Sequence, residues 1–501
     1  MIQTVIIFIA LLLSVFCHYN ANKEPAWWES YIPVMTLFAL VLSVLLTSNR
    51  NKYLNRCKYP IIMGLILLTG LLSIFLCNTA NTSIRAMYIA FATPSIIYLY
   101  DTNKKELRTI SAIIFIICLL VMIHYTSRTG IITMLLSGIY FLKIAFNPKK
   151  KYLISTFVIL IPLILLFFFI KRDSSSGRMF ILKNTAEMIM EKPFGRGSTG
   201  FETDYMIKQA EYFRNNIDEE NAMLADDIKH PLNEYMYVAV NYGIQTLVVI
   251  LVAVALLINI LHKENSGESR CFIHFITLLL LWSFFSYPFS VAYTKVVLLA
   301  YIAALPQTWK LLSRNKYITP LLSIALLFYC GIELRAFNDE MKWNNAIKKF
   351  KNRDKETAML VFEKSDDYLI DKGRMLYSLA TIEYQNKNYS RCIILCNECK
   401  KYSSGYDIEI LLANSYMFIG DYTKSLEHYS MAHNMCPVRF IPLYKQFKIY
   451  KELGDTVNMK KTGNKILSKQ VKIPSRKIDI IINNVKYELQ NMNSDITINN
   501  H

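Results

Sequence analysis

Long runs without charged residues constrain this chain more strongly than any other feature of its sequence. Residues 152–170 read YLISTFVILIPLILLFFFI, which is 19 positions without Asp, Glu, Lys, Arg or His. A helix of about 20 apolar residues crosses the hydrocarbon core of a bilayer. Comparable runs without Asp, Glu, Lys or Arg lie at 1–22, 30–49, 59–84, 86–100, 109–127, 235–261, 271–294 and 317–332, with shorter ones at 129–142 and 296–309. The pattern predicts an all-α, polytopic membrane protein with about 11 spans.

The positive charge of the chain follows this topology. The formal net charge is +18. The segments 48–59, 101–109, 147–151, 262–270 and 310–316 carry 4, 3, 3, 2 and 3 Lys or Arg residues. Loops rich in Lys and Arg stay on the cytoplasmic side of a membrane. We therefore expect a cytoplasmic N-terminus that leads into an uncleaved first span, and a C-terminal region on the opposite side. A charge explained in this way gives no reason to expect nucleic acid as a partner.

The residues from Lys171 to His230 form the only long polar segment between these runs. Loops of such length are usually functional or fold as modules of their own. Nine Lys or Arg residues are mixed with eleven Asp or Glu residues, so the loop is not a basic patch. Ser174–Ser176 predict the start of an amphipathic helix that ends before Pro193, and the glycine-rich turn PFGRGSTG follows. We expect one apolar face on this helix, formed by Met179, Phe180, Leu182, Ala186, Ile189 and Met190.

Six polar residues on the expected outward face are candidates for a functional site: Arg128, Arg178, Arg196, His230, Asn233 and Glu234. Arginine binds phosphate through two parallel hydrogen bonds and stays charged at any physiological pH. Neutral histidine accepts a proton near neutral pH. Simpler roles exist for two of the six. Arg128 is placed like an anchor at the membrane boundary, and Glu234 like a first-turn residue that favours a helix N-terminus.

Residues 333–501 are polar, rich in Lys and helical in pattern. The segment 413–422 recurs 34 residues later at 447–455, each with a Gly-Asp pair, and a weaker copy lies at 380–389. A period of about 34 residues is typical of tetratricopeptide repeats, which stack into a surface for a protein partner. We therefore expect a transmembrane domain over 1–332, which contains the loop 171–230, and a tetratricopeptide-like helical repeat domain over 333–501.

Ten cysteines are scattered along the chain. Cys392, Cys396 and Cys399 have the i, i+4, i+7 spacing of one helix face, which is typical of a buried stripe or, outside the cytoplasm, of disulfide partners. The sequence leaves the disulfide status of these residues and of Cys436 open. Zinc-type spacings are absent, so we expect no metal centre.

Three segments occur in a characteristic order. They are Ser127-Arg128 with Gly130, then GRMFILKNTAEMIMEKPFGRGSTGF, then HPLNEYMYVAVNYGIQTLVV, and together they cover about residues 110–260. In these segments the chain resembles the O-antigen ligase/polymerase superfamily of bacterial envelope glycosyltransferases. It departs from the pattern at Leu232, because many members have His-Asn where Leu232-Asn233 stands. A C-terminal tetratricopeptide module is similar to that of some members.

The resemblance implies transfer of a glycan from undecaprenyl diphosphate to lipid A-core or a protein hydroxyl, on the periplasmic face of the bacterial inner membrane. His230, Arg178 and Arg128 would be catalytic. The substrate-binding candidates are Arg196, Asn233 and Glu234. A lipid diphosphate is a good leaving group, so cations and one base suffice, and we expect no metal ion or other cofactor.

Other readings remain open. A repeat-unit polymerase would use the same donor chemistry. A membrane transporter predicts charged residues inside the spans and symmetry between halves, neither of which is evident in the sequence. A non-enzymatic scaffold for the repeats is the remaining alternative.

Overall fold

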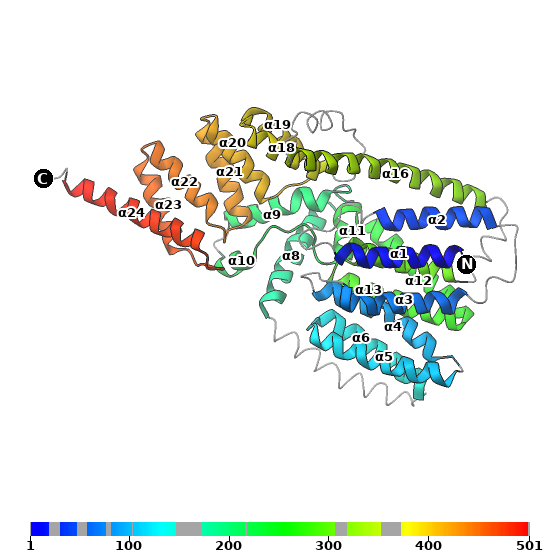
Figure 1. The fold of residues 1–501 in the computed structure, drawn as a ribbon. Helices are drawn as coiled ribbons and strands as arrows, with labels where there is room; N and C mark the ends of the chain where they lie inside the picture. Colours follow the sequence, from blue (N-terminus) through cyan, green and yellow to red (C-terminus); the bar gives the residue numbers. More distant parts are fainter. Residues whose placement is uncertain are drawn as a thin grey trace. The chain divides into compact units, whose positions relative to one another are not determined.

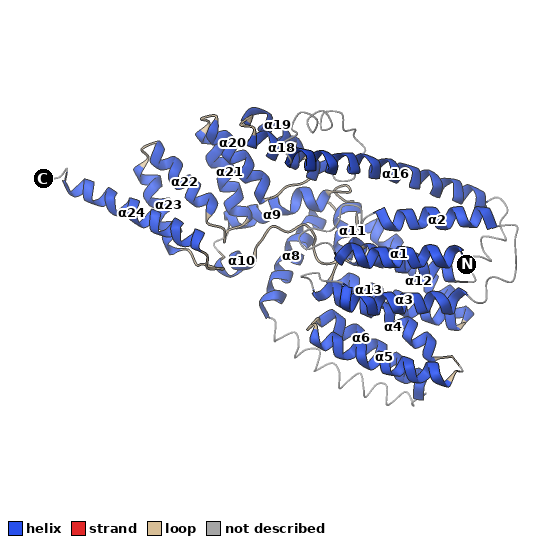
Figure 2. Ribbon diagram, viewed as in Figure 1, coloured by secondary structure: helices blue, strands red, loops and turns tan. Residues whose placement is uncertain are grey.

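The computed structural model describes residues 2–19, 31–47, 58–76, 82–102, 104–146, 172–215, 218–305, 318–351 and 372–498. Every regular element within these ranges is a helix (Figure 2), which confirms the all-α prediction. The predicted span 152–170 lies outside the described residues, as do most of the basic segments at 48–59, 147–151 and 310–316.

Apolar helices account for the hydrophobic runs in the described part of the chain. They are α1 (Ile2–Tyr19), α2 (Ile32–Thr47), α3 (Lys58–Leu76), α4 (Thr82–Tyr100), α5 (Lys105–His124), α6 (Arg128–Phe146), α12 (Ile244–Glu264), α13 (Gly267–Phe285), α14 (Ala292–Ala304) and the first part of α16 (Ile318–Lys351). Of the described helices, α5, α6, α12 and α13 are long and apolar enough to cross a membrane. These helices support a multi-pass membrane protein, while the number of about 11 spans stays a prediction.

Three helix boundaries differ from the apolar runs. The run at 235–261 forms two helices, α11 (Glu234–Tyr242) and α12, because Gly243 adopts φ +88° and ends the first. The run at 271–294 is interrupted after α13 by the short 3-10 helix η2 (Pro288–Ser290), whose proline lacks the N–H that an α-helix needs. Helix α16 continues to Lys351, well beyond the end of the apolar run at residue 332.

Contacts between residues group the chain into two compact units. Unit 1 contains residues 1–171, 232–235 and 248–369, and unit 2 contains 172–231, 236–247 and 370–501. The long polar loop therefore shares a unit with the C-terminal helices. The predicted domain boundary at residue 332 is based on the end of the apolar runs, whereas the two units are based on contacts between residues. The boundary stays a prediction.

Helix α4 lies at the centre of unit 1, where it packs against α3, α5, α6, α13 and α14. All residues from Ala86 to Ile97 are buried. A helix that is apolar on every side needs neighbours all around it. The close approach of α3 depends on Gly70, because a Cβ atom there would lie 2.6 Å from the Cβ of Ala92.

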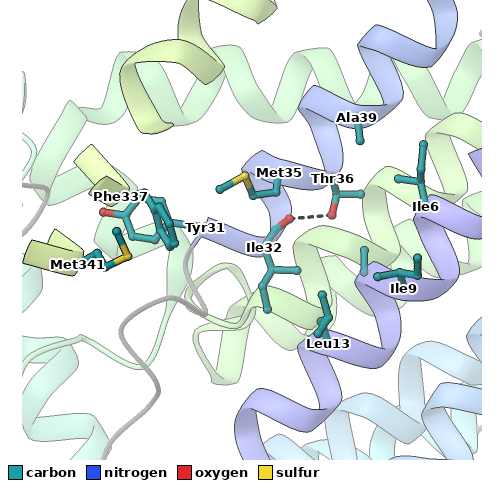
Figure 3. A pocket seen from close by; sticks show the side chains of 11 residues that line it. Ile6, Ile9, Leu13, Tyr31, Ile32, Met35, Thr36, Ala39, Phe337 and Met341 are labelled. Atoms are coloured by element: carbon teal, nitrogen blue, oxygen red, sulfur yellow. Dashed lines mark hydrogen bonds between the residues drawn. The ribbon is translucent and has the colours of Figure 1, made fainter. Parts of the chain in front are cut away.

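An apolar pocket of about 500 Å³ lies between α1, α2 and α16 of unit 1 (Figure 3). The Thr36 hydroxyl in its wall donates to the Ile32 carbonyl oxygen at 2.7 Å, so it adds little polarity. Tyr31 meets Phe337 edge-on with ring centroids 5.1 Å apart, and its hydroxyl donates to Glu340 at 2.7 Å. These contacts hold the end of α2 against α16.

Unit 2 combines helices of the loop with the C-terminal helices (Figure 1). The loop forms α8 (Arg172–Glu191), α9 (Gly200–Asn215) and α10 (Glu219–Leu224). The C-terminal helices are α18 (Lys372–Gln385), α19 (Tyr389–Cys399), α20 (Tyr406–Phe418), α21 (Tyr422–Met435), α22 (Ile441–Glu452), α23 (Thr456–Ser468) and α24 (Arg476–Ile498). Helices α18 and α19, α20 and α21, and α22 and α23 pack as hairpins, and α9 packs against α21.

The three hairpins share one turn geometry. A residue with positive φ precedes the cap of the next helix: Lys387 (63°) before Asn388, Gly420 (85°) before Asp421, and Gly454 (70°) before Asp455. The backbone N–H of each cap donates to the carbonyl oxygen five residues earlier at 2.9–3.0 Å, a common helix ending. The repeat in the sequence therefore corresponds to a repeated corner, in which the weaker copy has Lys in place of Gly. The tetratricopeptide assignment stays a prediction.

Helix α8 starts at Arg172, before the predicted cap at Ser174–Ser176, and its buried side coincides only in part with the predicted apolar face. Phe180 of that face is buried, but Met179 and Met190 are 67% and 72% exposed. Ile181 and Met188, which are not part of the predicted face, are buried. The cause is packing against α9 and α10, which helical spacing alone does not reveal.

Cys392, Cys396 and Cys399 are buried on α19 as free thiols, and Cys436 is likewise buried and free. The hydroxyl of Ser415 donates to the Cys392 sulfur at 3.3 Å. Of the two alternatives for these residues, the structure shows the buried stripe.

Candidate functional site

The turn PFGRGSTG lies against the end of α11 within unit 2. The N–H of Arg196 donates to the carbonyl oxygen of Val240 at 2.8 Å, and the N–H of Gly197 to that of Asn241 at 3.0 Å. These bonds satisfy carbonyl groups that the last turn of a helix leaves unpaired. Gly195 permits the approach, because its φ is +97° and a Cβ atom there would lie 2.7 Å from the Asn241 oxygen. Two of the three segments that carry the sequence resemblance are thus in direct contact.

The Arg196 side chain ties this turn to the helices beside it. Its guanidinium donates to Asp204 and Glu191, each at 2.7 Å, and to the Met188 carbonyl oxygen at 3.0 and 3.3 Å. The side chain is only 8% exposed. A hydrogen bond from Lys208, more than the one from Arg196, holds the pKa of Glu191 below its usual range. Arg196 is therefore engaged in contacts within the loop.

Arg178 is half-buried on α8, also in unit 2. The adjacent Gly177 faces α10, because a Cβ atom there would lie 3.8 Å from the Cβ of Leu224. Helix α10 is capped by Asp218. The Tyr212 hydroxyl (2.6 Å) and backbone N–H groups of α10 donate to that carboxylate and hold the pKa of Asp218 below its usual range. These contacts place the Arg178 segment beside the acidic part of the loop.

His230 is half-buried at the end of the loop. Its ring stacks on Tyr237 of α11 with centroids 4.7 Å apart and an interplanar angle of 20°. The Tyr237 hydroxyl donates to Glu202 at 2.9 Å. Neither Tyr237 nor Glu202 forms a recognisable motif in the sequence, because they are 35 positions apart. Together they define the plane in which the imidazole lies.

Leu232, two residues after His230, has φ +57°. This left-handed region is uncommon for residues with a side chain, and Asn, Asp and His adopt it more readily than Leu. The strained position is also the one at which the sequence departs from the pattern of the superfamily.

Asn233 and Glu234 belong to unit 1, where both are buried. The Asn233 amide donates to the Phe284 carbonyl oxygen at 3.1 Å, and the Glu234 carboxylate accepts from the N–H of Phe289 at 2.9 Å. Glu234 also opens α11, where an acidic residue favours the helix N-terminus. These contacts give both residues a structural role, and a contact with substrate stays a proposal.

Arg128 is the first residue of α6, in unit 1. Ser127 caps this helix by accepting from the N–H of Gly130 at 3.2 Å. A Cβ atom at Gly130 would lie 2.9 Å from the Met122 sulfur and 3.0 Å from the Cβ of Ala86. The Ser-Arg-Thr-Gly turn therefore places Arg128 at the junction of α4, α5 and α6.

The six candidates divide between the two units. Unit 1 holds Arg128, Asn233 and Glu234, and unit 2 holds Arg178, Arg196 and His230. Within unit 2, Arg196 and His230 both contact α11, through its last turn and through Tyr237. The set offers guanidinium groups for an anion and an imidazole for a proton. Within the described ranges, no three His, Cys, Asp or Glu side chains gather as a metal site.

A comparison with protein families places part of this chain. A family model described as O-Antigen ligase matches residues 70–251. The match supports the O-antigen ligase superfamily. It includes α4 to α6, the loop and α11, and hence all six candidate residues, while α18 to α24 lie outside it. Together with the apolar helices, it supports a multi-pass membrane protein of the glycan ligase or polymerase type. No curated protein and no solved structure matches the chain.

Proposed function

We propose that this chain is an O-antigen ligase-like glycosyltransferase. It would transfer a glycan from undecaprenyl diphosphate to an acceptor on the periplasmic face of the bacterial inner membrane. The observation that carries the proposal is the family match, because residues 70–251 contain all six candidate residues. The contact between the glycine-rich turn and α11 supports it, since this contact links two parts of the matched region.

In the proposed reaction, an acceptor hydroxyl oxygen bonds to the anomeric carbon of the glycan while the bond from that carbon to the diphosphate oxygen breaks. His230 takes the hydroxyl proton. Arg178 and Arg128 stabilise the negative charge of the departing diphosphate. The leaving group is already good, so we assign no step to a metal ion or other cofactor.

We assign no chemical step to the other three candidate residues. Asn233 and Glu234 remain candidates for contact with the substrate. The contacts of the Arg196 guanidinium favour a role in tying the turn to α8 and α9 over the phosphate contact expected from the sequence.

The acceptor distinguishes the two functions that fit the family match. A ligase hands the glycan to lipid A-core or a protein hydroxyl, whereas a polymerase joins repeat units to one another. The lipid-linked glycans of a deletion strain separate these functions. Full-length chains accumulate when a ligase is missing, and single units accumulate when a polymerase is missing.

Transfer by purified variants tests the mechanism. His230→Ala is expected to lower the rate about 10²–10⁴-fold with donor binding largely retained, because the base acts on the acceptor proton. Arg178→Lys should fail as well, since an ammonium group replaces a bidentate fork. Arg128→Lys should keep part of the activity if charge alone attracts the diphosphate. Near-normal transfer by all three variants at equal protein levels would remove this mechanism.

The proposed orientation places the C-terminal helices in the periplasm. A reporter enzyme that is active only in the periplasm should therefore be active when it is fused after Glu333, and a reporter that is active only in the cytoplasm should be inactive there. If only the cytoplasmic reporter is active, the proposed topology is wrong and the loop 171–230 lies on the cytoplasmic side of the membrane.

A further inference from the structure

The turn between α19 and α20 lies against the loop that carries His230. Ser404 in this turn is 1% exposed, and its backbone N–H (2.8 Å) and hydroxyl (3.3 Å) donate to the Glu202 carbonyl oxygen. Its own carbonyl oxygen accepts from the Lys229 ammonium group at 3.0 Å. One buried residue of the C-terminal helices thus contacts the neighbour of His230 in the chain and the residue that binds Tyr237.

We infer that the Ser404–Gly405 turn positions His230 for the proposed reaction. The first route is direct, because Lys229 precedes His230 and is held by its bond to Ser404. The second route passes through Glu202, whose carboxylate accepts from the Tyr237 hydroxyl at 2.9 Å. The Tyr237 ring in turn stacks on His230. This role rests on the proposed function, since it requires His230 to act as the base.

Gly405 leaves room for this contact. A Cβ atom there would lie 2.7 Å from the Lys229 nitrogen and 3.3 Å from a carboxylate oxygen of Asp227. Lys229 and Asp227 themselves form an ion pair at 3.2 Å. A Cβ atom at position 405 therefore shifts the Lys229 ammonium group, which weakens its bond to Ser404.

A second contact holds the segment just before Lys229. The Gln209 side chain donates to the carbonyl oxygens of Asp226 at 3.0 Å and Met435 at 2.6 Å. Arg439 donates to the Asp226 carboxylate at 2.8 Å and lies 4.2 Å from the ring centre of Tyr406. The C-terminal helices thus hold the segment 226–229 at both ends. A displacement of about 1 Å in a catalytic group lowers a rate about 100-fold. Contacts that fix the segment next to His230 should therefore affect the rate of transfer.

The test uses the full-length protein and separates kcat from donor binding. Gly405→Ala weakens the bond between Lys229 and Ser404, and Lys229→Met removes it. We expect each to lower kcat about 10- to 100-fold with donor binding unchanged. Both act on one contact, so the double variant should be no slower than the slower single variant. The matched control is Asp455→Ala, which removes the cap of α23 in the same set of helices and should leave kcat unchanged.

The His230→Ala background separates the possible outcomes. There, Gly405→Ala should cause no further loss, because no base remains to be positioned. A further loss in that background would indicate a general structural effect and overturn the inference. Normal kcat in Gly405→Ala and Lys229→Met would also overturn it, while the proposed function stands. Normal transfer by His230→Ala alone would instead overturn the proposed mechanism, and this inference with it.

Discussion

Replacing Arg196 with Ala removes the hydrogen bonds that tie the PFGRGSTG turn to Met188, Glu191 and Asp204. The two carboxylates are 48% and 34% exposed, so water replaces the guanidinium there and each pair contributes at most about 1 kcal/mol. The Met188 carbonyl oxygen keeps a hydrogen bond from the Lys192 N–H at 3.2 Å, so loss of the guanidinium there costs about 1 kcal/mol. The change should therefore lower the local stability of the turn by up to about 3 kcal/mol.

Hydrogen exchange measures this local loss. The backbone N–H groups of residues 196 and 197 donate to Val240 and Asn241, so they exchange when the turn opens. A loss of up to about 3 kcal/mol raises the population of the open turn by up to about 100-fold, and the exchange rate over residues 192–204 rises with it. Arg214→Ala is the matched control. It removes an exposed arginine at the end of α9 and should leave the exchange rate unchanged.

The opposite result would refute a structural role for this arginine. If exchange over residues 192–204 in Arg196→Ala equals that of the wild type while donor affinity falls, the guanidinium binds the diphosphate as the sequence suggested. Arg196→Lys should have an effect between those of the wild type and Arg196→Ala, because one ammonium group cannot reach both carboxylates and the Met188 carbonyl oxygen together. It should show intermediate exchange.

Three further changes test other parts of unit 2. Lys387→Gly should raise the free energy of unfolding by up to about 1 kcal/mol, because glycine adopts positive φ more easily; thermal unfolding measures this, and a lower melting temperature would contradict it. Gly195→Ala should loosen its turn by more than about 2 kcal/mol, since the new Cβ meets backbone atoms; unchanged exchange over residues 192–204 would exclude this. Burial lowers the pKa of Lys469 to about 7. Between about pH 7 and about pH 10 the unfolded chain then binds a proton that the folded chain does not, so stability should rise with pH. Lys469→Met should abolish this rise in melting temperature, and a rise that persists would assign it to other groups.

The apolar runs predicted most helices but not their ends. The runs at 235–261 and 271–294 look like single spans because hydropathy does not detect the positive φ of Gly243 or the missing N–H of Pro288. The buried side of α8 likewise depends on α9 and α10. Helical spacing shows which residues share a face, whereas the neighbours of that face come from the tertiary structure.

The repeated turn within the C-terminal hairpins was visible in the sequence, whereas the buried ionisable residues between these helices were not. Glu409 is 1% exposed and pairs with Lys400 and His428, each at 2.6 Å. Burial opposes its ionisation, but these two partners outweigh burial and hold the pKa of Glu409 below its usual range. An acidic residue on a helix normally indicates an exposed face, so the sequence gives no sign of this buried group.

For the candidate site, the residue types were predictable and most of their contacts were not. His230 and Arg196 stand out as ionisable residues in a loop between apolar runs. Tyr237 and Glu202 do not, because one lies in an apolar run and the other among many loop carboxylates. Their contact with each other and with His230 depends on how α9 and α11 fold together.

The contact between the loop and the C-terminal helices relies on main-chain acceptors. Glu202, Ser404 and Met435 each accept through the backbone carbonyl oxygen. That group is the same in every amino acid, so the residue type at these positions can change without removing the acceptor. Related chains can therefore keep these hydrogen bonds while their side chains at the three positions diverge.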